Sequence, residues 1–227
     1  MNSNQKTGRF IGVLLLFVFI SGIIIFQFLQ GSVLFLDNFL ITTSENSNQI
    51  ISSVVLGIFS GITSIVIATI LLPIFKRYSI SLAYLYLAFC ILNFLAIMID
   101  NVSVISMLEL SKEYLKNGSD NSFKILETLV SEKHWWTHYF YLLISCFPVF
   151  VLYYTLCLSK LVPRIISIFG IIAVVLMFIE ELFSIFGNSI SMNMLLPIGL
   201  IQLILPLWLI FKGLNSPILE TEIEQQH

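Results

Sequence analysis

The sequence predicts an all-α polytopic membrane protein with six transmembrane helices, on the basis of three observations. Of the 227 residues, 58% are hydrophobic and 11% are charged, and the mean hydropathy of +0.98 is too high for a water-soluble domain. Six stretches each hold about 20 mostly apolar residues, the length that a helix needs to cross a bilayer core of about 30 Å. Runs such as IGVLLLFVFISGIII do not alternate with a period of two, which excludes β-barrel strands.

The expected spans cover most of the chain between two short polar ends. Residues 1–9 precede the first span, which is longer than a signal-peptide core, lacks a small-x-small cleavage site and is therefore expected to be retained. Residues 213–227 form an acidic tail with little apolar surface, which we expect to be mobile. The six spans are predicted at 10–29, 50–75, 79–99, 135–158, 164–186 and 192–211.

The basic residues near the spans fall on one side of this topology. Lys6 and Arg9 precede the first span, whereas Asp37 and Glu45 lie in the loop on the opposite side. By the positive-inside rule, both termini are expected to be cytoplasmic. The other basic residues that support this orientation are Lys76, Arg77, Lys160, Arg164 and Lys212.

The long connection at about 100–134 is expected to form a short helical cap on the outer face. Helical spacing continues from Asp100 up to Asn117-Gly118, which is a typical helix stop. Ser122 is expected to cap a second, amphipathic helix that runs into the fourth span. The aromatic residues that follow have the composition of a membrane interface: Trp135, Trp136, Tyr139 and Tyr141.

Two adjacent carboxylates, Glu180 and Glu181, lie inside the apolar fifth span. A charge at the bilayer centre costs about 2.5 to 3.5 kcal/mol on insertion scales, so such an acid requires a partner, a proton or a wet cavity. Because neighbouring side chains diverge by about 100° on a helix, one is expected to face inward and the other the rim. Either the acids titrate or bind a cation, or interhelical hydrogen bonds hold them. We expect a polar pocket in the outer leaflet formed by Glu180, Glu181, Asp100, His138 and Asn93.

His134 and His138 are four residues apart, which places both imidazoles on one helical face. With Asp100 or Glu180 they could form a three-ligand zinc site and hence a membrane hydrolase. The motif lacks a flanking glutamate base, however, so neither a metal nor another cofactor is expected. There is no GxSxG sequence and no Gly-rich phosphate loop. No catalytic residue is identified, and an enzyme is not expected.

Small and polar residues in two other spans are interpreted as helix-packing positions. Ser53, Gly57 and Gly61 follow at four-residue spacing in the second span, where they allow another helix to approach closely, from this chain or from a second copy. Gln202 in the sixth span is expected to bond a neighbouring helix. Pro197 and Pro206 flank it, and each is expected to kink the span.

Several sequence segments resemble the bacterial domain-of-unknown-function family 4386. The most telling are Leu161-Val162-Pro163-Arg164, which leads into the fifth span, and LLP with WLIFKG in the sixth. The resemblance covers nearly all six spans and implies a six-helix protein of the bacterial inner membrane, without an assigned activity, cofactor or catalytic residue.

These observations favour a membrane protein that binds a small ligand, a lipid or a proton and acts as a permease-like or regulatory protein. A metal-dependent membrane hydrolase and a structural subunit of a membrane complex are the alternatives. The expected partners are the lipid bilayer and possible small ligands or further copies of the chain. Nucleic acid is not an expected partner, because the net charge is -2.

Overall fold

A computed structural model of the protein describes residues 3–34, 36, 39–118, 121–188 and 192–215, and these residues form helices without any strand. Six helices are long and apolar enough to cross a membrane, which confirms the predicted all-α, six-span class. Asp37 and most of the C-terminal tail lie outside the described residues. The elements are α1 (Ser3–Ile23), the π-helical η1 (Ile24–Gln30), α2 (Gly31–Leu34), α3 (Phe39–Glu45), α4 (Ser47–Phe75), α5 (Ile80–Asn117), α6 (Asn121–Ser159), α7 (Arg164–Ile185), the 3-10 turn η2 (Met192–Leu195) and α8 (Leu196–Lys212).

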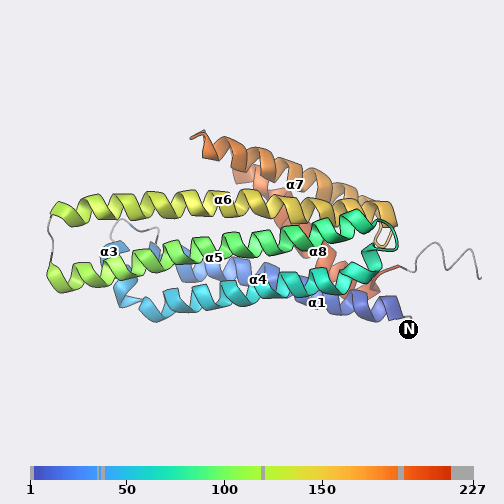
Figure 1. Ribbon diagram of the computed structural model, residues 1–227, viewed down its shortest axis with the longest axis horizontal. Helices are drawn as coiled ribbons and strands as arrows, with labels where there is room; N and C mark the ends of the chain where they lie inside the picture. Colours follow the sequence, from blue (N-terminus) through green and yellow to red (C-terminus); the bar gives the residue numbers. More distant parts are fainter. Residues whose placement is uncertain (1–2, 35, 37–38, 119–120, 189–191, 216–227) are drawn as a thin grey trace, which may run out of the picture.

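The six long helices form a closed bundle in which each packs against two neighbours. The order around the bundle is α1, α4, α5, α6, α7 and α8, and α8 returns to α1. The start of α1 and the end of α8 lie at the same end (Figure 1). Here a Cβ on Gly213, which has φ of 75°, would lie 2.6 Å from the carbonyl oxygen of Gln5. The bundle therefore closes through backbone contact that only glycine permits.

At this end of the bundle, the residues that follow α8 contact the turn between α6 and α7. The sequence segments with the family resemblance lie at these two places. The backbone N–H of Asn215 donates to the carbonyl of Leu161 at 2.9 Å. The Asn215 amide also donates to the carbonyl of Lys160 at 3.1 Å. The residues after α8 are therefore fixed to the α6–α7 turn.

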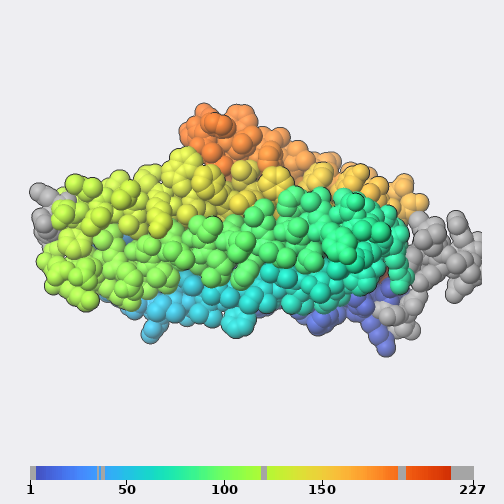
Figure 2. Space-filling view, viewed as in Figure 1, coloured from blue at the N-terminus to red at the C-terminus, as the bar shows by residue number. Residues whose placement is uncertain are grey.

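The α5–α6 hairpin is longer than a bilayer requires and extends along the whole face seen in Figure 2. Exposed apolar residues follow α5 from Ile80 to Val102, a stretch of about 33 Å at ~1.5 Å per residue. Beyond Val102 the helix continues to Asn117 and ends at Gly118, whose φ of 79° is the helix stop predicted from the sequence. α6 begins at Asn121, so Ser122 lies inside the helix rather than capping it. The two helices continue past the apolar band without a break.

The connection between the first two long helices is itself helical, which the sequence analysis did not predict. The Ser111 hydroxyl on α5 donates to the carbonyl of Leu40 at 2.6 Å and accepts from the backbone N–H of Ser44 at 2.8 Å. These bonds dock α3 onto the projecting hairpin. The buried side chains of this second apolar core are Val33, Leu34, Phe39, Leu40, Ile50, Val104, Met107 and Leu108.

The π-helical segment η1 is held by glutamine side chains. The Gln49 amide nitrogen on α4 donates to the carbonyls of Phe28 and Leu29 at 3.0 and 3.1 Å. The buried Gln30 amide donates to the Ser53 hydroxyl at 3.1 Å. Carbonyls that the wider π turns leave available are thus satisfied by α4.

The small-residue face of α4 packs inside the chain. A Cβ on Gly57 would lie 3.3 Å from the Asn101 amide, and one on Gly61 would lie 2.4 Å from the ring of Phe94, both on α5. Because α5 occupies this face, a helix of another chain has no access to it in this arrangement.

Helix α8 differs from the predicted sixth span at Pro197 and at Gln202. Pro197 lies in the first turn of α8, where a missing backbone N–H costs nothing, so the predicted kink there is wrong. Pro206 lies inside the helix as expected. Gln202 is half-buried, and no side-chain hydrogen bond joins it to the part of the chain described.

Candidate functional site

The most polar buried site in the bundle centres on Asp100 of α5, which is 7% exposed. The Thr137 hydroxyl on α6 donates to Asp100 Oδ1 at 2.9 Å. His134 Nδ1 lies 3.5 Å from Oδ1, and His138 Nδ1 lies 3.7 Å from Oδ2. Three α6 side chains therefore surround one carboxylate. We call Asp100, His134, Thr137 and His138 the Asp100 cluster.

Helical geometry and an aromatic wall hold this cluster in place. Positions 134, 137 and 138 are three and four residues apart, so all three side chains leave the same face of α6. The ring of Phe26, from η1, stacks on His138 with centroids 5.5 Å apart and an interplanar angle of 14°. The π-helical segment therefore contributes a ring that covers His138.

The cluster has the composition of a proton-binding site. A buried carboxylate is costly unless it is paired, and each imidazole compensates its charge only when protonated. Histidine is the side chain whose ordinary titration lies between about pH 5 and 8. The carboxylate and the two imidazoles can therefore share one bound proton. Binding or release of this proton changes the net charge buried in the cluster only modestly.

The structure selects Asp100 rather than Glu180 as the acid beside the two histidines. A zinc site requires three donors directed at one point about 2 Å from each. Among the described residues, no group of three or more His, Cys, Asp and Glu side chains is arranged to hold a metal ion. The absence of a cofactor remains a prediction, and no metal chemistry is derived from these residues.

The second buried acid site is the pair Glu180 and Glu181 on α7, which are 8% and 2% exposed. The Ser184 hydroxyl donates to Glu180 Oε1 at 3.2 Å, and the two carboxyls also interact with each other. The expectation that one acid faces the rim is wrong. α7 packs against α6 on one side and α8 on another. Two adjacent positions of α7 can therefore both be buried.

The predicted pocket residues are divided between these sites. Asp100 and His138 meet directly, whereas the glutamate pair acts electrostatically on Tyr139 and Cys146 at a different face of α6. Asn93 lies on the Asp100 side of α5, two turns or about 10 Å away along the helix. Its buried Oδ1 has no hydrogen-bond partner within the described ranges.

Sequence reasoning missed three contributors to the Asp100 cluster. His134 was considered only as a metal ligand, and Thr137 and Phe26 were not considered. Thr137 could have been found from its spacing, because positions 134, 137, 138 and 141 lie on one face of a helix. Phe26 had no such signal, because its position depends on η1.

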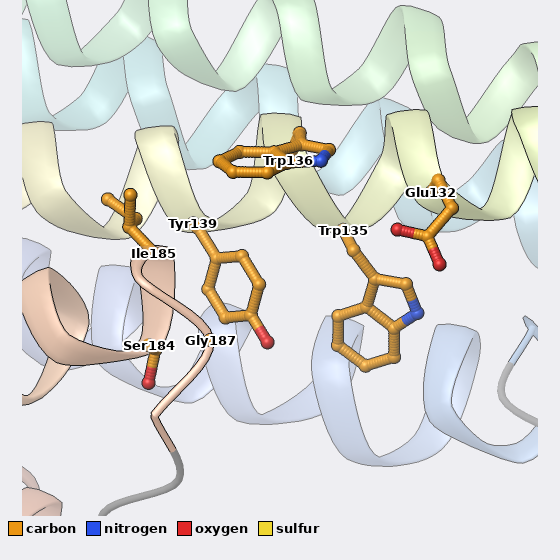
Figure 3. A pocket seen from close by; sticks show the side chains of 7 residues that line it. All are labelled: Glu132, Trp135, Trp136, Tyr139, Ser184, Ile185 and Gly187. Atoms are coloured by element: carbon orange, nitrogen blue, oxygen red, sulfur yellow. The ribbon is translucent and has the colours of Figure 1, made fainter.

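A hollow of about 300 Å³ opens between α6 and the end of α7 (Figure 3). Trp135 and Tyr139 point the same way from α6, and the Glu132 carboxylate lies beside Trp135 (Figure 3). The hollow adjoins both buried sites: the Trp135 ring centroid is 6.3 Å from that of His134, and Ser184 bonds Glu180. Its lining residues are Glu132, Trp135, Trp136, Tyr139, Ser184, Ile185 and Gly187.

Six long apolar helices in a closed bundle, with three acids and one histidine buried inside, define a multi-pass helical membrane protein. Residues 10–213 match the model of the family described as domain of unknown function (DUF4386). The chain belongs to this family, as the sequence resemblance predicted. No curated protein and no solved structure matches the chain.

Proposed function

We propose that this protein binds and releases protons at the Asp100 cluster and works as a permease-like or regulatory membrane protein. The observation that carries the proposal is the Asp100 carboxylate, 7% exposed, between two imidazole nitrogens at 3.5 and 3.7 Å. Ionisable residues inside membrane proteins commonly mark proton relays and substrate pathways.

Further polar groups along the α5–α6 interface support the permease-like part of the proposal. Two turns before Asp100 on α5, the buried amide oxygen of Asn93 accepts no hydrogen bond from the described residues. Farther along α5, the buried side chains of Tyr86 and Cys90 lie one turn apart on the helix. Tyr153 on α6 donates from its hydroxyl to the carbonyl of Ile201 at 3.3 Å. These groups lie at successive depths, as the groups of a proton path would.

We also propose that the protein resides in the bacterial inner membrane with both termini cytoplasmic. The turns after α4 and α6 carry Lys76, Arg77 and Lys160, and both turns lie at the end of the bundle where α1 begins (Figure 1). The positive-inside rule assigns this end to the cytoplasm. The Asp100 cluster then belongs to the outer leaflet, with the bilayer as the partner of the apolar surface.

Trp135 provides a direct test of proton binding, because its ring lies beside His134. The chain has three tryptophans, so a Trp136→Phe, Trp208→Phe variant retains Trp135 as the only indole. A protonated imidazole quenches a neighbouring indole, and the emission of this variant is expected to fall as the pH is lowered. His134→Gln in the same background is expected to abolish the transition.

Asp100→Asn makes the test specific to the cluster. Loss of the carboxylate removes the group that a protonated His134 would face, so the pH response of Trp135 is expected to differ from that of the parent variant. The other titratable groups near these rings are Tyr141, Glu132, Lys133, Tyr139 and the Glu180–Glu181 pair, and η1 contributes none. An unchanged midpoint in Asp100→Asn, or a transition that persists in His134→Gln, would contradict the proposal.

Proteoliposomes test whether the cluster also moves protons. With a pH-sensitive dye inside and an imposed pH gradient, a permease-like protein is expected to dissipate the gradient faster than empty vesicles. Asp100→Asn is expected to lose this activity, whereas Glu109→Gln, at an exposed acid on the same helix, is expected to retain it. If the wild type shows no flux but Trp135 responds to pH, the regulatory form of the proposal is retained and the permease-like form is rejected.

A further inference from the structure

The hollow between α6 and α7 has walls that match one class of ligand. Its volume of about 300 Å³ is at the lower end of the range of about 300–1,000 Å³ that is typical of small-molecule sites. Aromatic residues at a membrane interface ordinarily face lipid. Here Trp135 and Tyr139 instead line a concave site together with Ser184 and Gly187 from the end of α7.

The two rings present an aromatic surface to the hollow. Their centroids are 6.1 Å apart and their planes differ by 28°. They are four residues apart on α6, so the helix itself fixes this arrangement. A cation is attracted to an aromatic face within about 6 Å of the ring centroid. One small organic cation can therefore contact both rings at the same time.

The charge around the hollow is negative. The Glu132 carboxylate lines the hollow, and the buried acid pair Glu180 and Glu181 also lies within electrostatic reach of Tyr139. Within the described ranges, the lysine ion pairs join Lys112 to Glu109 and Lys116 to Glu113 on α5, and none includes these three acids.

The neighbouring lysine does not neutralise the hollow either. The ammonium of Lys133, next to Glu132 in sequence, is directed toward Ser106 on α5, with 3.5 Å between Nζ and Oγ. The exposed Glu132 carboxylate therefore keeps an uncompensated negative charge at the hollow, which attracts a cation.

We propose that the hollow binds the ammonium group of a small organic cation. Trp135 and Tyr139 would contact its alkyl groups through cation–π interactions, and Glu132 would provide the opposite charge at the rim. An alkylammonium ion fits this site better than a metal ion, because two of the walls are aromatic rings that offer no ligand atoms. The ammonium group can belong to a soluble cation or to a lipid headgroup, and both share this chemistry.

Binding can be measured through Trp135 at constant pH. In the Trp136→Phe, Trp208→Phe background, tetramethylammonium chloride is expected to change the Trp135 emission saturably, whereas sodium chloride at the same ionic strength is not. The uncharged isostere 3,3-dimethylbutanol separates charge recognition from apolar binding and is expected to bind more weakly. Equal responses to the ammonium ion and the alcohol would overturn the proposal.

Two variants in the hollow and one matched control test whether the ammonium ion binds there. Tyr139→Leu removes one aromatic face, and Glu132→Gln removes the rim charge without changing its size. Each is expected to weaken tetramethylammonium binding about three- to thirtyfold. Glu127→Gln changes a half-buried acid on the same helix that does not line the hollow, and its affinity is expected to equal that of the background. Unchanged affinity in both site variants would overturn the assignment.

Lipid nanodiscs identify the source of the ammonium group. If the natural ligand is soluble, tetramethylammonium changes the emission equally in phosphatidylglycerol and phosphatidylcholine nanodiscs. If it is a headgroup, the response appears in phosphatidylglycerol and is reduced in phosphatidylcholine, because the lipid occupies the site. No response in either nanodisc would refute the proposal.

The proposal does not depend on proton binding at the Asp100 cluster. The residues that carry it are Glu132, Trp135 and Tyr139, none of which belongs to that cluster. Tyr139→Leu is expected to weaken ammonium binding and leave the pH transition unchanged, and Asp100→Asn is expected to do the reverse. A variant that misses its own expected effect contradicts the proposal for that site and leaves the other proposal standing.

Discussion

The Thr137 hydroxyl donates to the Asp100 carboxylate at 2.9 Å and thereby links α6 to α5 inside the bundle. Thr137 is one turn from His134 and adjacent to His138, so one short segment of α6 provides every α6 contact in the Asp100 cluster. The same hydroxyl lies 3.0 Å from the His134 carbonyl, so it can donate to either acceptor, and its donation to the carboxylate does not require a protonated imidazole.

Thr137→Val is expected to destabilise the protein, because valine has nearly the same shape but no hydroxyl. The expected loss in the free energy of unfolding is about 1 to 2 kcal/mol for a buried hydrogen bond to a carboxylate. Unfolding by SDS in mixed micelles measures it. The control is Thr128→Val, where an exposed hydroxyl bonds only the Lys124 carbonyl. Equal stability of the two variants would contradict this role of Thr137.

Gly61→Ala is expected to destabilise the α4–α5 contact. The new Cβ would lie 2.4 Å from the Phe94 ring, so the helices must separate or the ring must move, at a cost of about 1 to 3 kcal/mol. Gly199→Ala in α8 is the matched control, because nothing lies within 4 Å of its Cβ position. Thermal unfolding in detergent distinguishes the two. If Gly61→Ala were as stable as Gly199→Ala, the close α4–α5 packing would be incorrect.

Gln49→Leu is expected to loosen η1, since the carbonyls of Phe28 and Leu29 lose the amide that satisfies them. Hydrogen exchange of a peptide covering residues 24–34 is expected to accelerate, with little change in α7. Gln202→Leu serves as the control, as its side chain lies on α8. Exchange in 24–34 that matches the wild type would show that η1 does not depend on Gln49.

Reporter fusions test the proposed orientation. Alkaline phosphatase, which is active only outside the cytoplasm, is expected to be active when fused after Gly118 and inactive when fused after Arg77. The opposite pattern would place the Asp100 cluster in the cytoplasmic leaflet.

The spans could be predicted from the sequence because insertion into a bilayer depends on local apolar content. The stop at Gly118 could also be predicted, since a helix that ends there needs a positive φ. Neither prediction requires knowledge of which helices are neighbours.

The Asp100 cluster could be predicted only in part, because it depends on which helices pack against each other. Asp100 and His134 are brought together by the α5–α6 packing, and the histidine spacing alone left Asp100 and Glu180 as equal candidates. The burial of both Glu180 and Glu181 depends on α6 and α8 covering two sides of α7. The helical form of the first connection and the π-helical form of η1 arise from tertiary hydrogen bonds to Ser111 and Gln49.

The straight continuation of α5 and α6 past the apolar band has a practical consequence for imaging. From Ser103 to Asn117 the hairpin extends about 22 Å at ~1.5 Å per residue, and docked α3 stiffens it. Small membrane proteins hidden in a detergent micelle offer electron microscopists little to align. This rod, emerging on one side only, would serve as a built-in fiducial marker and as a rigid epitope for antibody fragments.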